Sequence, residues 1–290
     1  MGKTLVIAEK PSVGRDIGRV LKCGKKIDGA LEGSQYIVTW GLGHLVTLAD
    51  PEHYDKKYKE WKMEDLPMLP VKMDIEVIKQ TGKQYQAVKR QIYRKDVSDI
   101  VIATDAGREG ELVARWILDK SGCHKPIKRL WISSVTDKAI RDGFAHLKNG
   151  HDYDNLYRAA QARAEADWLV GINATRLFTV LYHHRLIVGR VQTPTLAMLV
   201  EREKSIENFQ KEKYYLVHLL MDGLDAVSSR IKEKSAAVQM MEDMKDETAQ
   251  ILSVKKEKKK VQPPKLYDLT TLQREANRLL GFTAQQTLDY

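Results

Sequence analysis

The chain has 290 residues, so it can bury more than one hydrophobic core, and we predict two or more domains. Its 48 Lys and Arg against 39 Asp and Glu give a formal net charge of +9, which favours a polyanionic partner, although a soluble protein with a basic tail would carry the same charge. The two cysteines lie far apart, which argues against a disulfide framework and a zinc site and indicates the reducing cytoplasm. No apolar run could span a bilayer or act as a signal peptide, which argues against a membrane protein.

The amino-terminal half alternates strand-like and helix-like segments. A continuous apolar run at 4–10 predicts a strand, and Pro11 suits the first turn of a helix over 13–21. Further strands are predicted at 35–40, 100–105 and 127–133, and further helices at 83–94, 109–120 and 136–148. Ser134 and Asp137 resemble a capping box for the last of these helices. This alternation predicts an α/β fold with a mostly parallel sheet and helices on its faces.

After residue 150 the pattern becomes mainly helical. Apolar residues recur at helical spacing over 155–182, but Gly171 and Asn173 argue against one uninterrupted helix. A second helix follows the segment GRVQTP, with Pro194 in its first turn. Its apolar stripe is expected to be core: Leu196, Leu199 and Val200.

The carboxyl-terminal part begins with a strand-like segment at 214–221. Residues 255–265 contain six lysines, one acid and two prolines, which predicts a solvated connection between domains. The final residues, up to Tyr290, have the pattern of the start of another helical domain. We therefore predict four regions with boundaries at 1–150, 151–212, 213–265 and 266–290.

Acidic residues stand where the first and third predicted strands end. Glu9 ends the first strand, Asp105 ends the third, and Glu109 follows one helical turn later, whereas Glu111 points elsewhere. Ligands bind at the carboxyl ends of parallel strands, so neighbouring strands would bring Glu9 and Asp105 to one crevice. Two carboxylates about 4 Å apart repel by roughly 4 kcal/mol at an effective dielectric of about 20, so they need a cation. Oxygen ligands without His or Cys suit Mg²⁺, although either acid alone could be an exposed helix cap.

The residues around these acids resemble a known family. LVIAEKPS, followed later by IATDAGREGELVA, resembles the Toprim domain of type IA DNA topoisomerases. RAEADWLVGINATR and VGRVQTPTLAMLVERE resemble the segments that follow it in the bacterial topoisomerase III group. These motifs occur in family order, and the resemblance covers essentially the whole chain.

The resemblance implies a Mg²⁺-dependent, ATP-independent DNA isomerase whose Toprim domain is followed by a mainly α-helical DNA-binding domain. The family's metal pattern, a glutamate and an Asp-x-Asp-x-Glu group, falls here on Glu9, Asp105, Gly107 and Glu109. Gly107 departs from the pattern, so we expect one Mg²⁺, bound more weakly, through Glu9, Asp105 and Glu109. Lys10 would lie by the scissile phosphate and donate to its oxygen or leaving group; the alternative is an ordinary surface lysine.

Family members bind single-stranded DNA in a groove of the helical domain. Here the helix that follows VGRVQTPT would point free backbone amides at a phosphate. Stacking of a base on a tryptophan contributes on the order of 1 to 3 kcal/mol, although Trp168 has the neighbours of a core residue. The implied DNA contacts are Trp61, Trp168, Arg176, Gly189, Arg190, Val191, Gln192, Thr193 and Pro194. His44, in a Gly-His-Leu stretch typical of the family, is interpreted as a hydrogen-bonding residue outside the chemistry.

The family's nucleophile is not found in these residues. Type IA enzymes attack the phosphodiester with a tyrosine in a Tyr-Pro-Arg context and store the bond as a 5′-phosphotyrosine. No tyrosine here is followed by Pro-Arg, so Tyr290 is not expected to be the nucleophile. We expect an amino-terminal part that holds Mg²⁺ and binds single-stranded DNA, without a nucleotide cofactor or a membrane, at the bacterial nucleoid, and that does not relax supercoils by itself.

Two other classes share part of this pattern. A Toprim nuclease or primase would use the same acids without a tyrosine, but it would not account for GRVQTPT. A non-catalytic single-strand binder would keep the basic groove and be indifferent to the loss of Glu9 or Asp105. Cleavage without a covalent adduct would indicate the nuclease, and binding unaffected by a chelator would indicate the binder.

Overall fold

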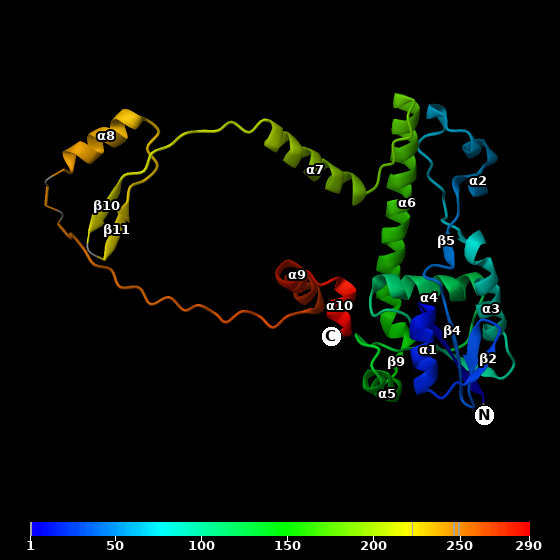
Figure 1. The fold of residues 1–290 in the computed structure, drawn as a ribbon. Coiled ribbons are helices and arrows are strands. Elements are labelled where there is room, and N and C mark those ends of the chain that lie inside the picture. Colours follow the sequence, from blue (N-terminus) through cyan, green and yellow to red (C-terminus); the bar gives the residue numbers. More distant parts are fainter. Residues whose placement is uncertain (1, 222, 246, 249) are drawn as a thin grey trace. The chain divides into compact units, whose positions relative to one another are not determined.

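A seven-stranded sheet organises the first of the two units into which the chain divides, Met1–Phe209 and Gln210–Tyr290. The computed structural model describes residues 2–221, 223–245, 247–248 and 250–290 (Figure 1). The strand order is β2-β3-β4-β1-β7-β8-β9. These strands are β1 (Lys3–Ala8), β2 (Lys25–Ile27), β3 (Ala30–Glu32), β4 (Tyr36–Trp40), β7 (Val97–Ala103), β8 (Ile127–Arg129) and β9 (Lys148–Asn149).

The centre of the sheet is parallel, as predicted. β4, β1, β7 and β8 run parallel, whereas β2, β3 and β9 pair antiparallel at the edges. Side chains of β1 alternate between the two faces, so that Leu5 joins one buried cluster and Val6 the other. Ala8 lies opposite Ala103, which brings the residues after β1 and β7 to the same edge.

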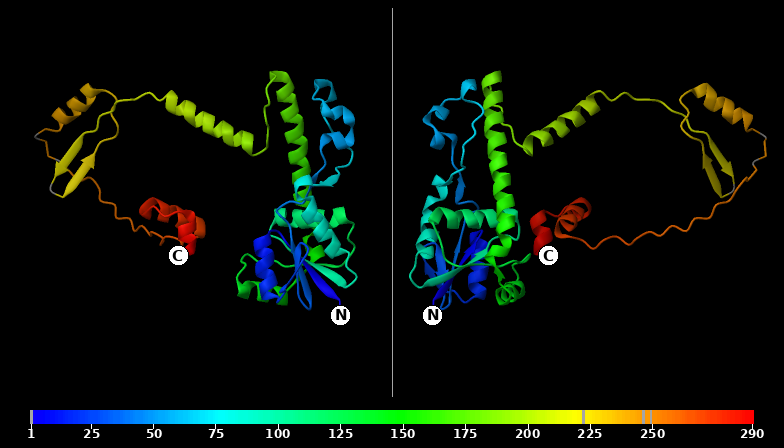
Figure 2. Two further views of the ribbon diagram at one scale, coloured as in Figure 1. Left: turned by 45° about the vertical axis from the view of Figure 1, so that its right-hand side comes forward. Right: turned by 180° about the vertical axis from the view of Figure 1, so that it is seen from behind.

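Helices cover both faces of the sheet (Figure 1 and Figure 2). The flanking helices are α1 (Pro11–Val20), α3 (Gly82–Ile92), α4 (Arg108–Ser121) and α5 (Asp137–Ala145). α1 and α5 bury Ile17 and Ile140 in the cluster that contains Val6. α3 and α4 bury Val88 and Ile117 in the cluster that contains Leu5. A further helix, α6 (Asp154–Tyr182), packs on α4 and supplies Ala160 to the same cluster.

Short elements fill the long insertion between β4 and α3 and the turn before α6. β5 and β6 form a two-stranded antiparallel sheet beside the main one. The elements are β5 (Val46–Leu48), α2 (Pro51–Tyr54), β6 (Ile75–Val77) and the 3-10 turns η1 (Lys56–Lys59), η2 (Met63–Asp65), η3 (Lys79–Thr81) and η4 (Gly150–Tyr153).

In the first unit, one strand and one helix end three or four residues before their predicted ends. The strand expected at 127–133 stops at Arg129, because its neighbour β7 already ends at Ala103 and β9 offers only two residues for pairing. The helix expected at 136–148 ends at Ala145, and the next residues become the edge strand β9.

The predicted capping box at the start of α5 was also wrong. Thr136 is the N-cap, and its hydroxyl accepts from the amide of Ala139 at 3.4 Å. The hydroxyl of Ser134 instead accepts from the amide of Thr136 at 3.3 Å. Each of these two hydroxyls thus accepts a hydrogen bond from a backbone amide, and the N-cap is Thr136, two residues after the predicted Ser134.

The expected break in the helix over 155–182 is absent, since α6 continues through Gly171 and Asn173. The amide group of Asn173 donates to the carbonyl of Met68 at 3.0 Å, and its oxygen accepts from the amide of Met68 at 2.6 Å. Asn173 therefore anchors the insertion on α6 instead of ending the helix. A tertiary hydrogen bond has overridden a weak local preference.

α7 (Gln192–Glu207) begins as predicted, but its apolar stripe is not core among the residues that the structure describes. Leu196, Leu199 and Val200 are 59%, 60% and 42% exposed. No other element in the described parts of the chain covers this stripe, so the prediction of burial was wrong here.

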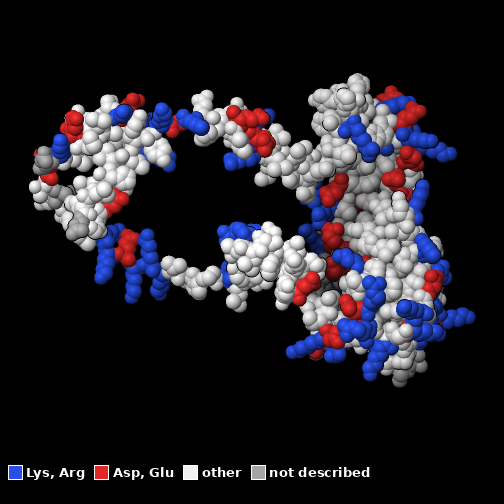
Figure 3. Space-filling model, in the orientation of Figure 1, with Lys and Arg blue, Asp and Glu red and all other residues white. Residues whose placement is uncertain are grey.

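The second unit contains the hairpin of β10 (His218–Met221) and β11 (Leu224–Val227) and the helix α8 (Lys234–Asp243). The predicted strand over 214–221 is reduced to β10 and an isolated bridge from Tyr215 to Ile231. Residues 255–265 are exposed and form neither helix nor strand, and lysines project from this extended segment (Figure 3). Two helices follow, α9 (Leu269–Leu280) and α10 (Ala284–Asp289).

Candidate metal and nucleic-acid site

Glu9 and Asp105 lie together at the carboxyl edge of the sheet. They follow the paired strands β1 and β7, and the backbone amide of Asp105 donates to a carboxylate oxygen of Glu9 at 3.0 Å. Glu9 is half-buried and Asp105 is exposed. The structure therefore brings the two acids predicted from the strand ends to the same edge of the sheet, in direct contact through this hydrogen bond.

A buried arginine holds the turn that carries Asp105. The Arg129 guanidinium is fully buried and donates to the carbonyl oxygens of Thr104 at 2.8 Å and Asp105 at 2.6 Å. It also pairs with the Glu111 carboxylate at 2.9 Å. Burial lowers the pKa of Arg129, and attraction to Glu111 opposes this shift. Glu111 was predicted to point away from the other acids, and the structure buries it, so that it supports the backbone geometry of the site through Arg129.

Of the two glycines in the acidic motif, one leaves no space for a side chain and the other does. A Cβ on Gly110 would lie 2.2 Å from the carbonyl oxygen of Asp105, so only glycine lets the start of α4 approach this turn. Gly107 has extended backbone, φ −178° and ψ 177°, and a Cβ there would meet nothing within 4 Å. The space at Gly107 would therefore accept a side chain.

Glu109 does not lie with the other two acids as a third ligand. Its carboxylate pairs with Arg163 of α6 at 2.5 Å. In the parts of the chain that the structure covers, no three His, Cys, Asp or Glu side chains are arranged to hold a metal ion. The donor set of Glu9 and Asp105 still fits Mg²⁺, which is commonly held by one or two carboxylates and completes its shell with water and phosphate.

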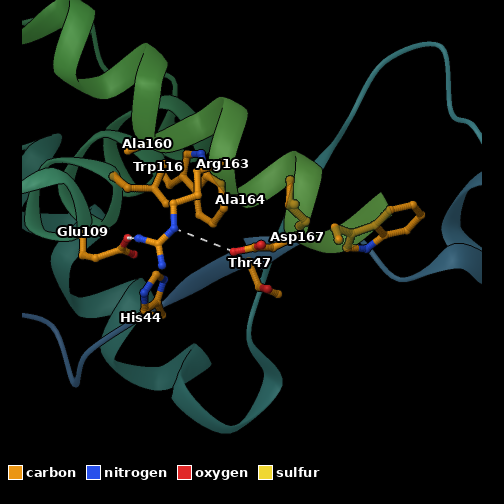
Figure 4. Close-up of a pocket in the computed structure, with 11 residues that line it drawn as sticks. His44, Thr47, Glu109, Trp116, Ala160, Arg163, Ala164 and Asp167 are labelled. Atoms are coloured by element: carbon orange, nitrogen blue, oxygen red, sulfur yellow. Dashed lines mark hydrogen bonds and ion pairs between the residues drawn. The ribbon is translucent and has the colours of Figure 1, made fainter. Parts of the chain in front are cut away.

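A cavity of about 410 Å³ lies next to Glu109 (Figure 4). It is lined by His44 and Thr47 in and just before β5, by Trp116 of α4, and by Arg163 and Asp167 of α6. The His44 ring meets the Trp116 ring edge to face, with 6.3 Å between centroids. His44, left outside the chemistry by the sequence, thus shares a cavity with a residue of the acidic motif.

The residues expected to stack DNA bases line a second cavity of about 540 Å³ between the insertion and α6. The guanidinium of Arg176 donates to the carbonyl of Tyr58 at 2.6 Å and lies 5.1 Å from the centre of the Trp61 ring. Burial lowers the pKa of Arg176. The indole N–H of Trp168 donates to the carbonyl of Ala49 at 3.1 Å. Arg176 and Trp168 therefore build the wall of this cavity, while Trp61 remains 39% exposed.

The segment before α7 folds on itself. The amide of Gly189 donates to the hydroxyl of Thr193 at 3.0 Å, and the amide of Thr193 donates to the carbonyl of Gly189 at 3.1 Å, so that this amide is not free. Arg190 pairs with Asp167 at 2.5 Å and holds the pKa of Asp167 below its usual range through that hydrogen bond. The remaining predicted contacts here are the exposed Val191, Gln192 and Pro194, and in the turn after β1 the exposed Lys10.

Comparison with known proteins decides the family. A family model described as Toprim domain matches residues 4–135, and one described as DNA topoisomerase matches residues 151–290. DNA topoisomerase 3 of Bacillus licheniformis is 58% identical over 99% of this chain, and that of Bacillus subtilis is 56% identical over 99% of it. This chain belongs to the type IA DNA topoisomerases.

The resemblance within the type IA family is to topoisomerase III. The chain spans 41% of the length of the two Bacillus relatives. Full-length topoisomerase I from Thermotoga maritima has a similar fold, with a TM-score of 0.63 over 98% of this chain and 45% of that chain at 24% identity. Among the helices in the described ranges, none combines the length and the hydropathy needed to cross a bilayer.

Three charged residues that organise this candidate site were not predicted: Arg129, Arg163 and Asp167. Arg129 interrupts the apolar pattern IKRLWI, and a charged residue in a buried strand pattern signals an internal partner. Arg163 and Asp167 are four residues apart in RAEAD, a spacing that places them on one face of a helix. Neither signal identifies the partner of the charged residue. Arg163 and Asp167, for example, pair with Glu109 and Arg190, which come from other elements.

Proposed function

We propose that this chain is the metal-binding and DNA-binding amino-terminal part of a topoisomerase III-like enzyme, which cleaves and rejoins one DNA strand with Mg²⁺. The observation that carries the proposal is the contact between Glu9 and Asp105 at the sheet edge, where the Asp105 amide donates to the Glu9 carboxylate. The cavity lined by Trp61 and Arg176 lies in the same unit. A site for a cation and a groove for single-stranded DNA are the two parts that such a reaction requires of these residues.

In this proposal the side chains bind and orient the DNA. Glu9 and Asp105 would hold Mg²⁺, which stabilises negative charge on a phosphate when it is bound. Lys10 follows Glu9 and would donate a proton or a hydrogen bond to the scissile phosphate. Trp61 offers an exposed ring for a base, and Arg190 offers a guanidinium for a phosphate.

The covalent step is assigned to a tyrosine outside these residues. No tyrosine is followed by Pro-Arg within these 290 residues. We infer that the 290 residues bind Mg²⁺ and single-stranded DNA but do not by themselves form the 5′-phosphotyrosine or relax supercoils. Activity on chromosomal DNA would place the whole enzyme at the bacterial nucleoid.

Titration with Mg²⁺ by calorimetry tests the metal site. Glu9→Gln removes one of two carboxylate charges, so we expect the Kd for Mg²⁺ to rise about tenfold or more. Glu203→Gln, a change at an exposed glutamate of α7, is the matched control and should leave the curve unchanged. Coincident curves for Glu9→Gln and the unchanged chain would rule out the metal site.

The same proteins can be tested with a labelled single-stranded oligonucleotide. Binding that is weakened both by a chelator and by Glu9→Gln supports the proposed function. Binding that is indifferent to both would instead identify a non-catalytic single-strand binder. Metal-dependent cleavage with no covalent adduct would identify a Toprim nuclease.

A further inference from the structure

Four side chains of alternating charge connect the acidic motif to the segment before α7. Glu109 in the first turn of α4 pairs with Arg163 of α6 at 2.5 Å. Arg163 lies 3.8 Å from Asp167, one turn further along α6. Asp167 in turn pairs with Arg190 at 2.5 Å. Figure 4 shows the guanidinium of Arg163 between the carboxylates of Glu109 and Asp167.

Arg163 lies within ion-pair distance of two carboxylates, those of Glu109 and Asp167. Asp167 makes its short contacts to Arg190, and its contact with Arg163 is the longer one. Arg163 is thus free to direct its short hydrogen bond to Glu109. The two side chains of that pair are 37% and 59% exposed, so solvent and ligands can reach them and the exchange of partners requires no unfolding.

Both ends of this series of charges belong to segments that carry proposed ligand sites. Glu109 belongs to the acidic motif with Glu9 and Asp105. While the Arg163 guanidinium is paired with the Glu109 carboxylate, it competes with a metal cation for that carboxylate. Arg190 is the cation of the segment proposed to meet a DNA phosphate. A phosphate at Arg190 would compete with Asp167 for the same guanidinium hydrogen bonds.

We propose that Arg163 is a positioning residue that withholds Glu109 from Mg²⁺ until single-stranded DNA binds. This inference rests on the proposed function. When a phosphate takes Arg190, Asp167 is left with Arg163 as its cationic partner, and Arg163 turns from Glu109 to Asp167. Glu109 then joins Glu9 and Asp105 as the third carboxylate. DNA and Mg²⁺ therefore bind cooperatively, and each raises the affinity of the other by the same factor.

Calorimetry on the whole 290-residue chain without DNA gives the first test. Arg163→Gln frees Glu109, so we expect Mg²⁺ to bind about two to five times more tightly. Arg158→Gln removes the same charge from an exposed position of α6 that has no ion pair in the described chain, and it should change the affinity less. In a Glu109→Gln background, Arg163→Gln should have no effect beyond that of Arg158→Gln.

A single-stranded oligonucleotide gives the second test. In the unchanged chain it should tighten Mg²⁺ binding by about the same factor as Arg163→Gln does. Asp167→Asn removes the carboxylate that draws Arg163 away, so the oligonucleotide should no longer tighten Mg²⁺ binding in that variant. Circular dichroism of each variant establishes that the fold is intact.

The outcomes separate the inference from the proposed function. Equal Mg²⁺ affinity of Arg163→Gln and Arg158→Gln would overturn the inference while leaving the metal site in place. An undiminished effect of Arg163→Gln in the Glu109→Gln background would overturn it as well, because the effect would then be charge acting through space. Mg²⁺ binding that is absent, or insensitive to Glu9→Gln, would overturn both.

Discussion

Gly107 and Gly110 stand three residues apart in the acidic motif, but only one of them is required by the backbone. A side chain on Gly110 would collide with the carbonyl of Asp105, whereas a side chain on Gly107 would enter open space from an extended backbone. Gly107 occupies the position where the related Toprim pattern has an aspartate. Its glycine therefore removes a charge from the site without providing a conformation that other residues cannot adopt.

Substitution of Gly107 tests what the missing carboxylate would contribute. Gly107→Asp should tighten Mg²⁺ binding about tenfold, because it adds a negative charge beside Asp105. Gly107→Asn has the same size without the charge and should leave the affinity unchanged. Calorimetric titration of both variants measures the difference, and equal affinities would show that this position does not face the metal.

Arg129, Arg163 and Arg176 show how the tertiary structure assigns roles to arginines that look alike in sequence. Arg129 is fully buried and holds the turn of Asp105 through backbone carbonyls. Arg163 is partly exposed and pairs with one acid of the motif. Arg176 is buried against Trp61 and holds the insertion. The sequence named only Arg176, and it did so by resemblance.

At the scale of elements, one glutamate joins three parts of the sheet layer. Glu32 at the end of β3 accepts from the ammonium of Lys3 in β1 at 2.6 Å and from the guanidinium of Arg94 after α3 at 2.6 Å. Its side chain is 10% exposed, so water screens these pairs little. The hydrogen bond from Lys3, which has the larger effect, and the one from Arg94 hold the pKa of Glu32 below its usual range.

Because this pKa is lower in the folded state than in the unfolded state, the ionised carboxylate stabilises the fold above the unfolded pKa of about 4.3. That contribution is lost as the pH falls through the folded-state value. Glu32→Gln should therefore lower the free energy of unfolding by about 1 to 2 kcal/mol at pH 7, with a difference from the unchanged chain that shrinks below about pH 4. Urea denaturation across this pH range measures it.

Glu64→Gln changes an exposed glutamate of η2 and serves as the control for Glu32→Gln. It should leave the free energy of unfolding nearly unchanged at both ends of the pH range. A constant difference between Glu32→Gln and the unchanged chain from pH 7 to pH 3 would contradict the role assigned to the ionised carboxylate.

Elements with strong apolar patterns were predicted well, and their ends were predicted poorly. β1, β4, β7, α3 and α4 follow from apolar runs and helical periodicity. The ends of β8 and α5 and the continuity of α6 depend on partners that are distant in sequence, such as Met68 for Asn173. Local patterns carry no information about those partners.

At the scale of the whole molecule, the chain holds the proposed binding groups, and the Bacillus relatives that it matches are longer. The Bacillus relatives are matched over 41% of their length. We expect that a protein of their full length, incubated with labelled single-stranded DNA and Mg²⁺ and then denatured with detergent, retains label on the protein. The 290-residue chain treated in the same way should retain none, because it offers no Tyr-Pro-Arg nucleophile.

A labelled 290-residue chain would contradict this assignment of the nucleophile. The first tyrosine to change would then be Tyr290, which is 95% exposed. Loss of the label in Tyr290→Phe would identify it as the nucleophile. Full-length protein that carries no label, under conditions in which it binds the oligonucleotide, would contradict the proposed covalent chemistry.

The sequence by itself determined the α/β class, the family and the meeting of Glu9 with Asp105. Each of these depends on local patterns, because apolar runs define parallel strands and parallel strands bring their carboxyl ends to one edge. Only the tertiary structure decided that Glu109 pairs with Arg163, which lies 54 residues further along the chain, and that Arg129 supports the turn of Asp105. Ion pairs form between whichever charged groups packing brings within a few ångströms, and the helix and strand patterns of a sequence do not contain that distance.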